Sequence, residues 1–472
     1  MKFFSLPLLR LAGLLLAALF AGCASYTDQT QSLRAAWAAG AFPQAKQIAA
    51  TAAQQSSRTD NVLWNLEAGA TARAAGDFTG SLNAFNAADG LFDYWDNEPD
   101  ISLSRETAAM FINSTVLPYR GYDYDRIMES VYQALNYLAL SQFDQARVEL
   151  NRALERQQIA QTRNAARVDA AQKAAANSGV STGYDAARAQ ADPRFQSQLH
   201  DMYGALDNLK YYANYANPFA TYLRAVCLLA RPLSDTDNES ARVDFTRVQA
   251  MIGHNAYIDA DCALATQLTT GGKLPPLTFV IYETGQAPDR VEQRIDIPVF
   301  LASRDVPYFG IAFPKLSFNP QFSPGLVVQA RGGAALSTAL LCDMDSVVAQ
   351  EFRNDLPEVI VKTLVSGGLK AAALFGTHQG TKDHDLLDDL TQISGLIYQE
   401  ATNRADLRTW VTLPKQIQFC RLPTPADHKL YLARAGMNES LEVDLPDSPV
   451  TMVYVKSTSP GAPLAIQILS LR

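Results

Sequence analysis

Small and apolar residues recur at helical spacing in the N-terminal part of the chain, each time after a short turn-like signature. The signature places a small residue two positions before a phenylalanine, at Gly40-Ala41-Phe42, Gly76-Asp77-Phe78 and Ser141-Gln142-Phe143. In each copy, small or apolar residues follow the phenylalanine at three, seven and ten positions. These offsets lie on one face of a helix, so the pattern predicts a series of helix pairs. A fourth copy, without the turn, comprises Ala241, Phe245 and Val248.

The C-terminal part shows a different period. Apolar and polar residues alternate in Arg294–Val299 and Leu441–Leu445, which predicts strands with one face toward water. Further predicted strands are 277–284, 308–313, 416–421, 429–433, 451–456 and 464–471. Helical sequence interrupts them at 359–375, after the helix-start pattern at Asp355–Glu358, and again at 386–404. We therefore predict an antiparallel sheet or sandwich with a helical hairpin packed on it.

Composition divides the chain near residue 275. Residues 24–274 contain 49 alanines and 6 prolines, whereas residues 275–472 contain 18 alanines and 16 prolines. Because alanine favours helices and proline interrupts them, we predict an α+β protein of two domains. The helical domain is 23–274, with insertions near 93–126 and 156–216, and the β-rich domain is 275–472.

The first 22 residues have the pattern of a targeting signal. Lys2 and Arg10 precede an apolar run that is shorter than the roughly 20 residues a membrane-spanning helix needs. The following segment, Leu19-Phe20-Ala21-Gly22-Cys23, resembles the lipobox of bacterial lipoproteins, which implies cleavage before Cys23 and acylation of that cysteine. The alternative is a plain secretory signal. In enterobacteria-like sorting an aspartate after the cysteine retains a lipoprotein in the inner membrane, so Ala24 implies the outer membrane, with the body facing the periplasm.

The helical signatures resemble the tetratricopeptide repeat, a helix–turn–helix unit of about 34 residues. The resemblance implies a solenoid with a concave groove, although a generic helical bundle is the alternative. The residues it places in the groove are Leu63, Leu66, Ala70 and Arg73 in one copy, and Met128, Val131, Leu135 and Leu138 in the next. This set is mostly apolar, so it predicts either a peptide site or a face that the insertion at 156–216 covers. We favour coverage by the insertion.

The remaining cysteines are Cys227, Cys262, Cys342 and Cys420. In an oxidising periplasm disulfides are permitted, and the natural pairs are Cys227 with Cys262 and Cys342 with Cys420. The alternative is four buried free thiols, and none of the four has the spacing of metal ligands.

Other candidate chemistry is sparse. His378, Asp383, His384 and Asp385 could hold zinc, but Asp383 or Asp385 could equally cap a helix. Asp343 and Asp345 are a candidate carboxylate pair without a recognisable partner, and His200, His254 and His428 are isolated. We predict no metal, no cofactor and no enzymatic activity. The net charge of −8 gives no indication of nucleic-acid binding.

A broader resemblance is carried by three blocks: Val280–Pro288, Asn217-Pro218-Phe219, and Trp410…Leu413-Pro414 with Arg421-Leu422-Pro423. They resemble a family of bacterial outer-membrane lipoproteins with tetratricopeptide-like repeats and a C-terminal β-rich domain. No activity attaches to that family, whose genes tend to lie beside small lipoproteins similar to activators of penicillin-binding proteins. The resemblance implies a protein–protein interaction adaptor in cell-envelope or peptidoglycan-synthesis assembly. The alternatives are a structural component or assembly factor of a surface or secretion apparatus, and a cell-wall or polysaccharide hydrolase.

Overall fold

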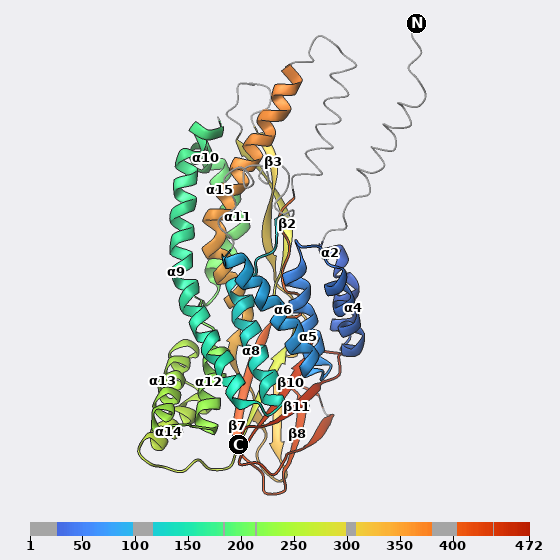
Figure 1. The fold of residues 1–472 in the computed structure, drawn as a ribbon, viewed down its shortest axis with the longest axis vertical. Coiled ribbons are helices and arrows are strands. Elements are labelled where there is room, and N and C mark those ends of the chain that lie inside the picture. The colour runs from blue at the N-terminus through green and yellow to red at the C-terminus, as the bar shows by residue number, and fades with distance from the viewer. Residues whose placement is uncertain are drawn as a thin grey trace, which may run out of the picture.

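The computed structural model describes residues 26–97, 117–182, 185–212, 215–298, 308–379, 404–437 and 439–472. The helices are α2 (Tyr26–Gln29), α3 (Gln31–Ala38), α4 (Phe42–Gln55), α5 (Asn61–Ala74), α6 (Phe78–Asn97), α8 (Asp123–Ala139), α9 (Phe143–Thr182), α10 (Ala186–Gln190), α11 (Pro193–Tyr203), the 3-10 helix η2 (Gly204–Asn208), α12 (Pro218–Ala230), α13 (Asp235–Ile252), α14 (Ala256–Thr269) and α15 (Met344–Gln379). The strands are β1 (Leu277–Thr284), β2 (Asp289–Pro298), β3 (Tyr308–Ser317), β4 (Leu326–Ala330), β5 (Leu336–Ser337), β6 (Ala339–Asp343), β7 (Gln416–Pro423), β8 (Lys429–Arg434), β9 (Ser440–Asp444), β10 (Val450–Ser457) and β11 (Ala465–Ser470). A helical region therefore precedes a sheet-rich region, which confirms the predicted α+β fold class (Figure 1).

The predicted helix pairs are present as α3 with α4, α5 with α6, and α8 with α9. The small residue of each signature adopts a left-handed backbone between the two helices, with φ of 69° at Gly40, 79° at Gly76 and 58° at Ser141. Glycine tolerates this conformation without a steric penalty, which explains why glycine occupies two of these three positions. The next helix then begins at the phenylalanine of the signature. Its predicted inward face is buried, as Phe85 and Leu150 show.

Two sheets form a sandwich beneath the helices. The five-stranded sheet has the order β11-β10-β1-β7-β6, and the four-stranded sheet has the order β5-β4-β8-β9. One apolar core lies between the two sheets, with Val280 and Val453 from the first sheet and Val328 and Leu432 from the second. Alternate residues of the first sheet, such as Ile281, enter the other core, which the helices cover. The layers are therefore helices, five-stranded sheet and four-stranded sheet.

Two features of the C-terminal region differ from the prediction. The five-stranded sheet is mixed, because β1 pairs in parallel with β10, and alternation of side chains does not reveal strand direction. Helix α15 begins at Met344 and continues through Pro357. Burial of Val348 and Phe352 in its first half favours helix there despite the proline. Most of the second predicted helix, 386–404, lies outside the described residues.

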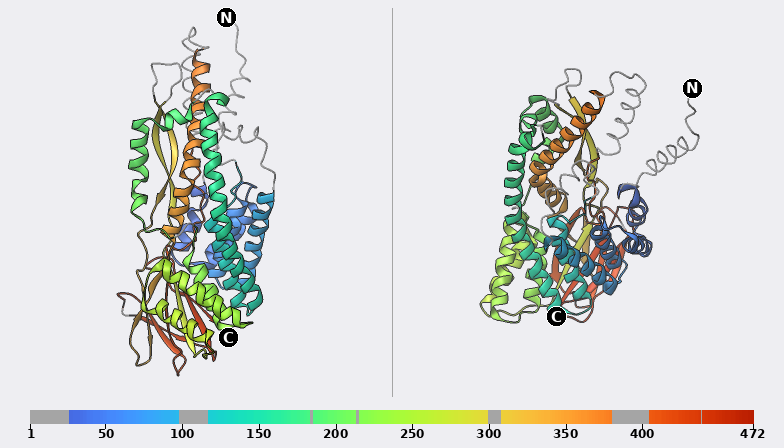
Figure 2. Two further views of the ribbon diagram at one scale, coloured as in Figure 1. Left: turned by 90° about the vertical axis from the view of Figure 1, so that its left-hand side faces the viewer. Right: turned by 45° about the horizontal axis from the view of Figure 1, so that its top comes forward.

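A projecting arm extends from the body of the molecule. It consists of the C-terminal half of α9, helices α10, α11 and α15, and the two-stranded ribbon β2–β3 (Figures 1 and 2). Helix α15 approaches the ribbon closely at Gly367, where an added Cβ would lie 1.8 Å from Cδ1 of Ile311. The inserted segment 156–216 contributes to this arm, so its helices pack on α15 and β2.

Candidate interaction surfaces

The predicted groove is covered by other parts of this chain, including the strands β10 and β11. All eight groove residues are buried. Strand β11 packs on α8, and Asn217, at the start of α12, contacts Met128. On α5, Gln467 of β11 donates a hydrogen bond to the carbonyl oxygen of Arg73 at 3.0 Å, and the Arg73 guanidinium lies 4.8 Å from the ring centroid of Tyr454. The prediction that the insertion covers this face is therefore wrong. Its helices instead pack in the arm, because α15 and the β2–β3 ribbon offer them an apolar surface.

Glu67 of α5 bonds to three separate residues at this interface. Its buried carboxylate accepts hydrogen bonds from the backbone N–H of Val411 at 2.6 Å, the hydroxyl of Thr412 at 2.7 Å and the hydroxyl of Tyr26 at 3.2 Å. Burial raises the pKa of Glu67 to about 7, against the effect of these hydrogen bonds, which favour the charged form. One side chain thus joins α2, α5 and the segment that leads into β7.

A second group of buried polar residues joins α8 to the sheet and to α15. The Tyr132 hydroxyl donates to Glu283 of β1 at 2.9 Å, and Glu283 also forms an ion pair with Lys456 of β10. At the start of α8, the Glu351 carboxylate accepts the backbone N–H groups of Asp123 and Tyr124 at 2.7 and 2.9 Å. The side chain of a C-terminal helix therefore satisfies two N–H groups that the first turn of α8 leaves unpaired.

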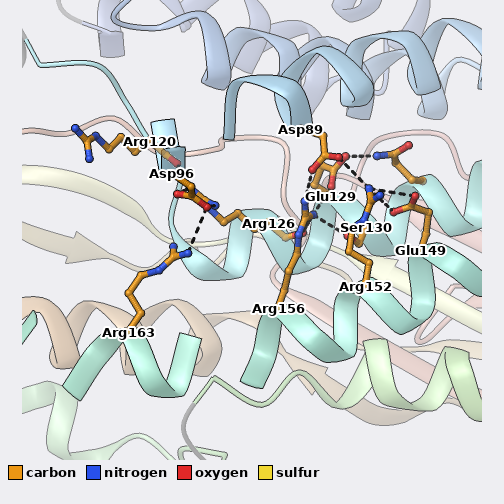
Figure 3. Close-up of polar contacts among 11 residues, drawn as sticks. Asp89, Asp96, Arg120, Arg126, Glu129, Ser130, Glu149, Arg152, Arg156 and Arg163 are labelled. Atoms are coloured by element: carbon orange, nitrogen blue, oxygen red, sulfur yellow. Dashed lines mark hydrogen bonds and ion pairs between the residues drawn. The ribbon is translucent and has the colours of Figure 1, made fainter. Parts of the chain in front are cut away.

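Arginines and carboxylates form a third network, between α6, α8 and α9 (Figure 3). Arg156 of α9 donates to Glu129 at 2.6 Å and to Ser130 at 2.7 Å, and it pairs with Asp89 of α6. Glu129 is fully buried and burial raises its pKa to about 7, although Arg156 opposes this shift. Because these carboxylates are already bonded to arginines, the network holds the long helix α9 against the other two.

The four described cysteines are free thiols, and the structure contains neither predicted disulfide. Cys342 and Cys420 lie on the neighbouring strands β6 and β7, but Cys342 belongs to the core under the helices and Cys420 to the core between the sheets. Their side chains therefore point to opposite faces of one sheet. Cys227 lies on α12 and Cys262 on α14, and each of these helices packs on α13. Cys23 lies outside the described residues.

The candidate carboxylates and metal ligands named from the sequence do not form a common site in the described part of the chain. Asp343 accepts a hydrogen bond from Ser346, and Asp345 pairs with Lys415, so the two carboxylates have separate partners. Helix α15 continues to Gln379, and Asp383, His384 and Asp385 lie beyond the described residues. Among the described residues, no three histidine, cysteine, aspartate or glutamate side chains are grouped so that they could hold a metal ion. No helix in those same ranges is long and apolar enough to cross a membrane.

The surface of the described residues includes the following two hollows. One of about 60 Å³ lies between α9 and α12 and includes Phe143, Cys227 and Arg231. Burial raises the pKa of the Cys227 thiol to about 12, so it is not a reactive thiolate. The other, of about 260 Å³, lies between α11 and α15 and includes His200 and Arg353. There Arg353 pairs with Asp207 at 3.2 Å.

The outer face of the four-stranded sheet is a further surface, which the sequence pattern did not single out. Leu430 and Leu432 of β8 point into the sandwich, so Lys429, Tyr431 and Ala433 point outward. Tyr431 lies between Gln329 of β4 and Glu442 of β9 in the strand register. We call this surface, made of the outward residues of β4, β8 and β9, the outer sheet face. No described helix packs on these three strands.

Polar contacts hold the side chains of the outer sheet face in place. Arg331 donates to the Tyr431 hydroxyl at 3.2 Å and lies 3.6 Å from Asp427, while Lys429 pairs with Glu442. Tyrosine and arginine are the residue types that most often dominate the energy of protein interfaces. The alternation in 429–433 predicts which residues face outward, but it does not reveal that this face stays uncovered.

The chain matches no protein-family model, no curated protein and no solved structure in the comparisons made. The resemblance to a lipoprotein family therefore stays a prediction.

Proposed function

We propose that the protein is an outer-membrane lipoprotein that faces the periplasm and acts as an adaptor, binding an envelope protein through the outer sheet face. The observation that carries this proposal is the uncovered sheet centred on Tyr431, with Arg331 and Glu442 around it. The groove of the helix pairs, which is the usual binding surface of helical repeats, is occupied by the chain's own strands. The outer sheet face is thus the better candidate for a partner.

The proposed partner class is the cell-envelope or peptidoglycan-synthesis machinery. This part of the proposal rests on the lipobox-like segment before Cys23 and on the family resemblance. It is consistent with an interface of mixed polar and aromatic character, which is typical of non-obligate complexes.

Anchoring is tested with Cys23→Ala, expressed in a bacterial host and followed by membrane fractionation and intact-mass analysis. We expect wild-type protein to carry acyl chains and to sediment with the outer membrane, since more than one chain is needed for stable anchoring. The variant should lose the acyl mass and leave the membrane fraction. A variant that stays on the outer membrane without acyl chains would show that another element is the anchor.

Partner binding is tested by site-specific photocrosslinking in cells. A photoreactive residue in place of Tyr431 should give a discrete adduct with an envelope protein. The same residue in place of His254, whose side chain is 78% exposed on the helical side, is the matched control and should not give that adduct. Equal adducts from both positions, or none from Tyr431, would contradict the proposal. Release of soluble fragments from purified peptidoglycan by the wild-type protein would support the hydrolase alternative.

A further inference from the structure

The edges of the sheets differ in how they are protected from pairing with another strand. An exposed strand edge carries unpaired N–H and C=O groups, and proteins commonly block it with charges, bulges, short strands or a covering element. Strand β5 has two residues, and β9 carries Glu442 and Asp444. Strand β6 has an irregularity between Leu340 and Cys342 and packs against α12 and α13.

The ribbon edges are blocked by side chains of α11. The amide of Gln198 donates to the carbonyl oxygen of Asp296 on β2 at 3.2 Å and accepts the backbone N–H of Asp296 at 3.1 Å. The Tyr203 hydroxyl donates to the carbonyl oxygen of Pro314 on β3 at 2.8 Å. Side chains therefore occupy backbone groups that an added strand would use.

Strand β11 has none of the charges, register shifts or short length that protect the other edges, and helix α8 packs only on its buried face, which carries Leu469. Its sequence, Ala465-Ile466-Gln467-Ile468-Leu469-Ser470, contains no charge and no proline. It lies at the end of the five-stranded sheet, with β10 as its one neighbour among the described strands. Ile468 is 40% exposed and Ser470 is exposed, so solvent reaches this strand.

The hydrogen-bond phase of β11 defines which backbone groups point outward. The N–H of Leu471 donates to the carbonyl oxygen of Val450, and the register continues with Leu469 opposite Met452 and Gln467 opposite Tyr454. In an antiparallel pair, residues alternate between those bonded to the partner strand and those whose N–H and C=O point away. The backbone groups of Ile466, Ile468 and Ser470 therefore point to the open edge.

We infer that β11 is a dimerisation edge, at which β11 of a second copy of this chain pairs antiparallel with it and extends the five-stranded sheet. If the two-fold axis passes at Ile468, Ile468 of one copy lies opposite Ile468 of the other. Ile466 of each copy then lies opposite Ser470 of the other. Uncharged residues thus meet uncharged residues, and the half-exposed isoleucines bury each other. Antiparallel pairing of β9 with β9 of a second copy, about an axis at Glu442, would place the two Glu442 carboxylates opposite each other. Like-charge repulsion disfavours that arrangement.

The test is sedimentation equilibrium of the full-length protein in density-matched detergent, over a range of protein concentrations. Two variants disrupt the edge: Ile468→Lys adds a charge at the two-fold axis, and Ser470→Pro removes an outward N–H. Leu441→Lys is the matched control, because Leu441 is 48% exposed on the edge strand of the other sheet. We expect a wild-type dimer, a dissociation constant raised at least about tenfold in both edge variants, and a change below about twofold in the control.

Amide hydrogen exchange gives a second measurement that does not depend on a variant. The N–H groups of Ile466, Ile468 and Ser470 should exchange more slowly at a concentration where the dimer forms than at a tenfold lower total concentration. Three results would overturn the inference: a monomer throughout the concentration range, a dimer that neither edge variant weakens, or a dimer that Leu441→Lys weakens as much as Ile468→Lys.

Discussion

Replacement of Glu67 by alanine tests whether the helix pairs and the β-rich part are held together by buried hydrogen bonds. The substitution removes the acceptor of three donors: the N–H of Val411, the hydroxyl of Thr412 and the hydroxyl of Tyr26. All three residues are buried, so water is not available to replace the lost carboxylate.

The expected loss follows from the number of donors left unpaired. A buried donor without a partner costs about 1–3 kcal/mol. Thr412 keeps one hydrogen bond, because its hydroxyl also accepts from Nε1 of Trp410 at 2.8 Å. Removal of a desolvated carboxylate offsets part of the cost, since burial raises the pKa of Glu67 to about 7. We therefore expect Glu67→Ala to lower the free energy of unfolding by about 3–5 kcal/mol.

The assay is urea denaturation at pH 7, with hydrogen exchange of residues 409–413 as a local measurement. Glu67→Gln is the matched variant, because its side-chain carbonyl still accepts from Val411, and it should lose less than half as much stability. Asn65→Ala is the control on the same helix, since Asn65 bonds only to Asn61, and should lose less than about 1 kcal/mol. A loss from Glu67→Ala no larger than that of Asn65→Ala would refute the reasoning.

The pKa of Glu67 and the arginine network give two further predictions. Because the folded state raises the pKa of Glu67 from 4.5 to about 7, it binds the proton more tightly than the unfolded chain, so stability falls as pH rises through this window. The contribution of this residue is about 3 kcal/mol. Unfolding measured between pH 5 and pH 8 should therefore depend less on pH in Glu67→Gln, and an unchanged pH profile would exclude this contribution. Arg156→Met should lower the free energy of unfolding by about 3–5 kcal/mol because it leaves the buried Glu129 without a cation. Arg156→Met/Glu129→Gln should recover part of that loss, and no recovery would show that Glu129 is not the group left unpaired.

Local sequence signals predicted the secondary structure of the described chain closely in several places. The turn signature works because a small residue at 40, 76 or 141 accommodates a left-handed backbone and because the following spacing gives one apolar helical face. The predicted strand at 277–284 has the bounds of β1. These features depend on neighbours within a few residues, which the sequence displays directly.

Features that depend on distant segments could not be predicted in the same way. The apolar groove residues correctly predicted a covered face, but the identity of the cover depends on where β10 and β11 lie in space. The cysteine pairs were chosen by position in the chain, whereas the face to which each strand residue points decides that Cys342 and Cys420 lie in different cores. Charged residues such as Glu67 and Glu283 gave no sequence signal of burial, because their partners are far away in the chain.

The claim that the β-rich part completes the core of the helix pairs is tested most directly by a folding measurement. The measurement asks whether residues 24–274 fold without the β-rich part. Separation would expose the buried faces of α5 and α8, including Leu66 and Val131, and would leave Glu67 without its bonds to 411 and 412. We expect this fragment to lack a cooperative thermal transition and to gain one when residues 275–472 are supplied in trans. A monomeric fragment that unfolds cooperatively by itself, with the helix content that α2–α14 require, would contradict the account, since its groove would then be free for a partner.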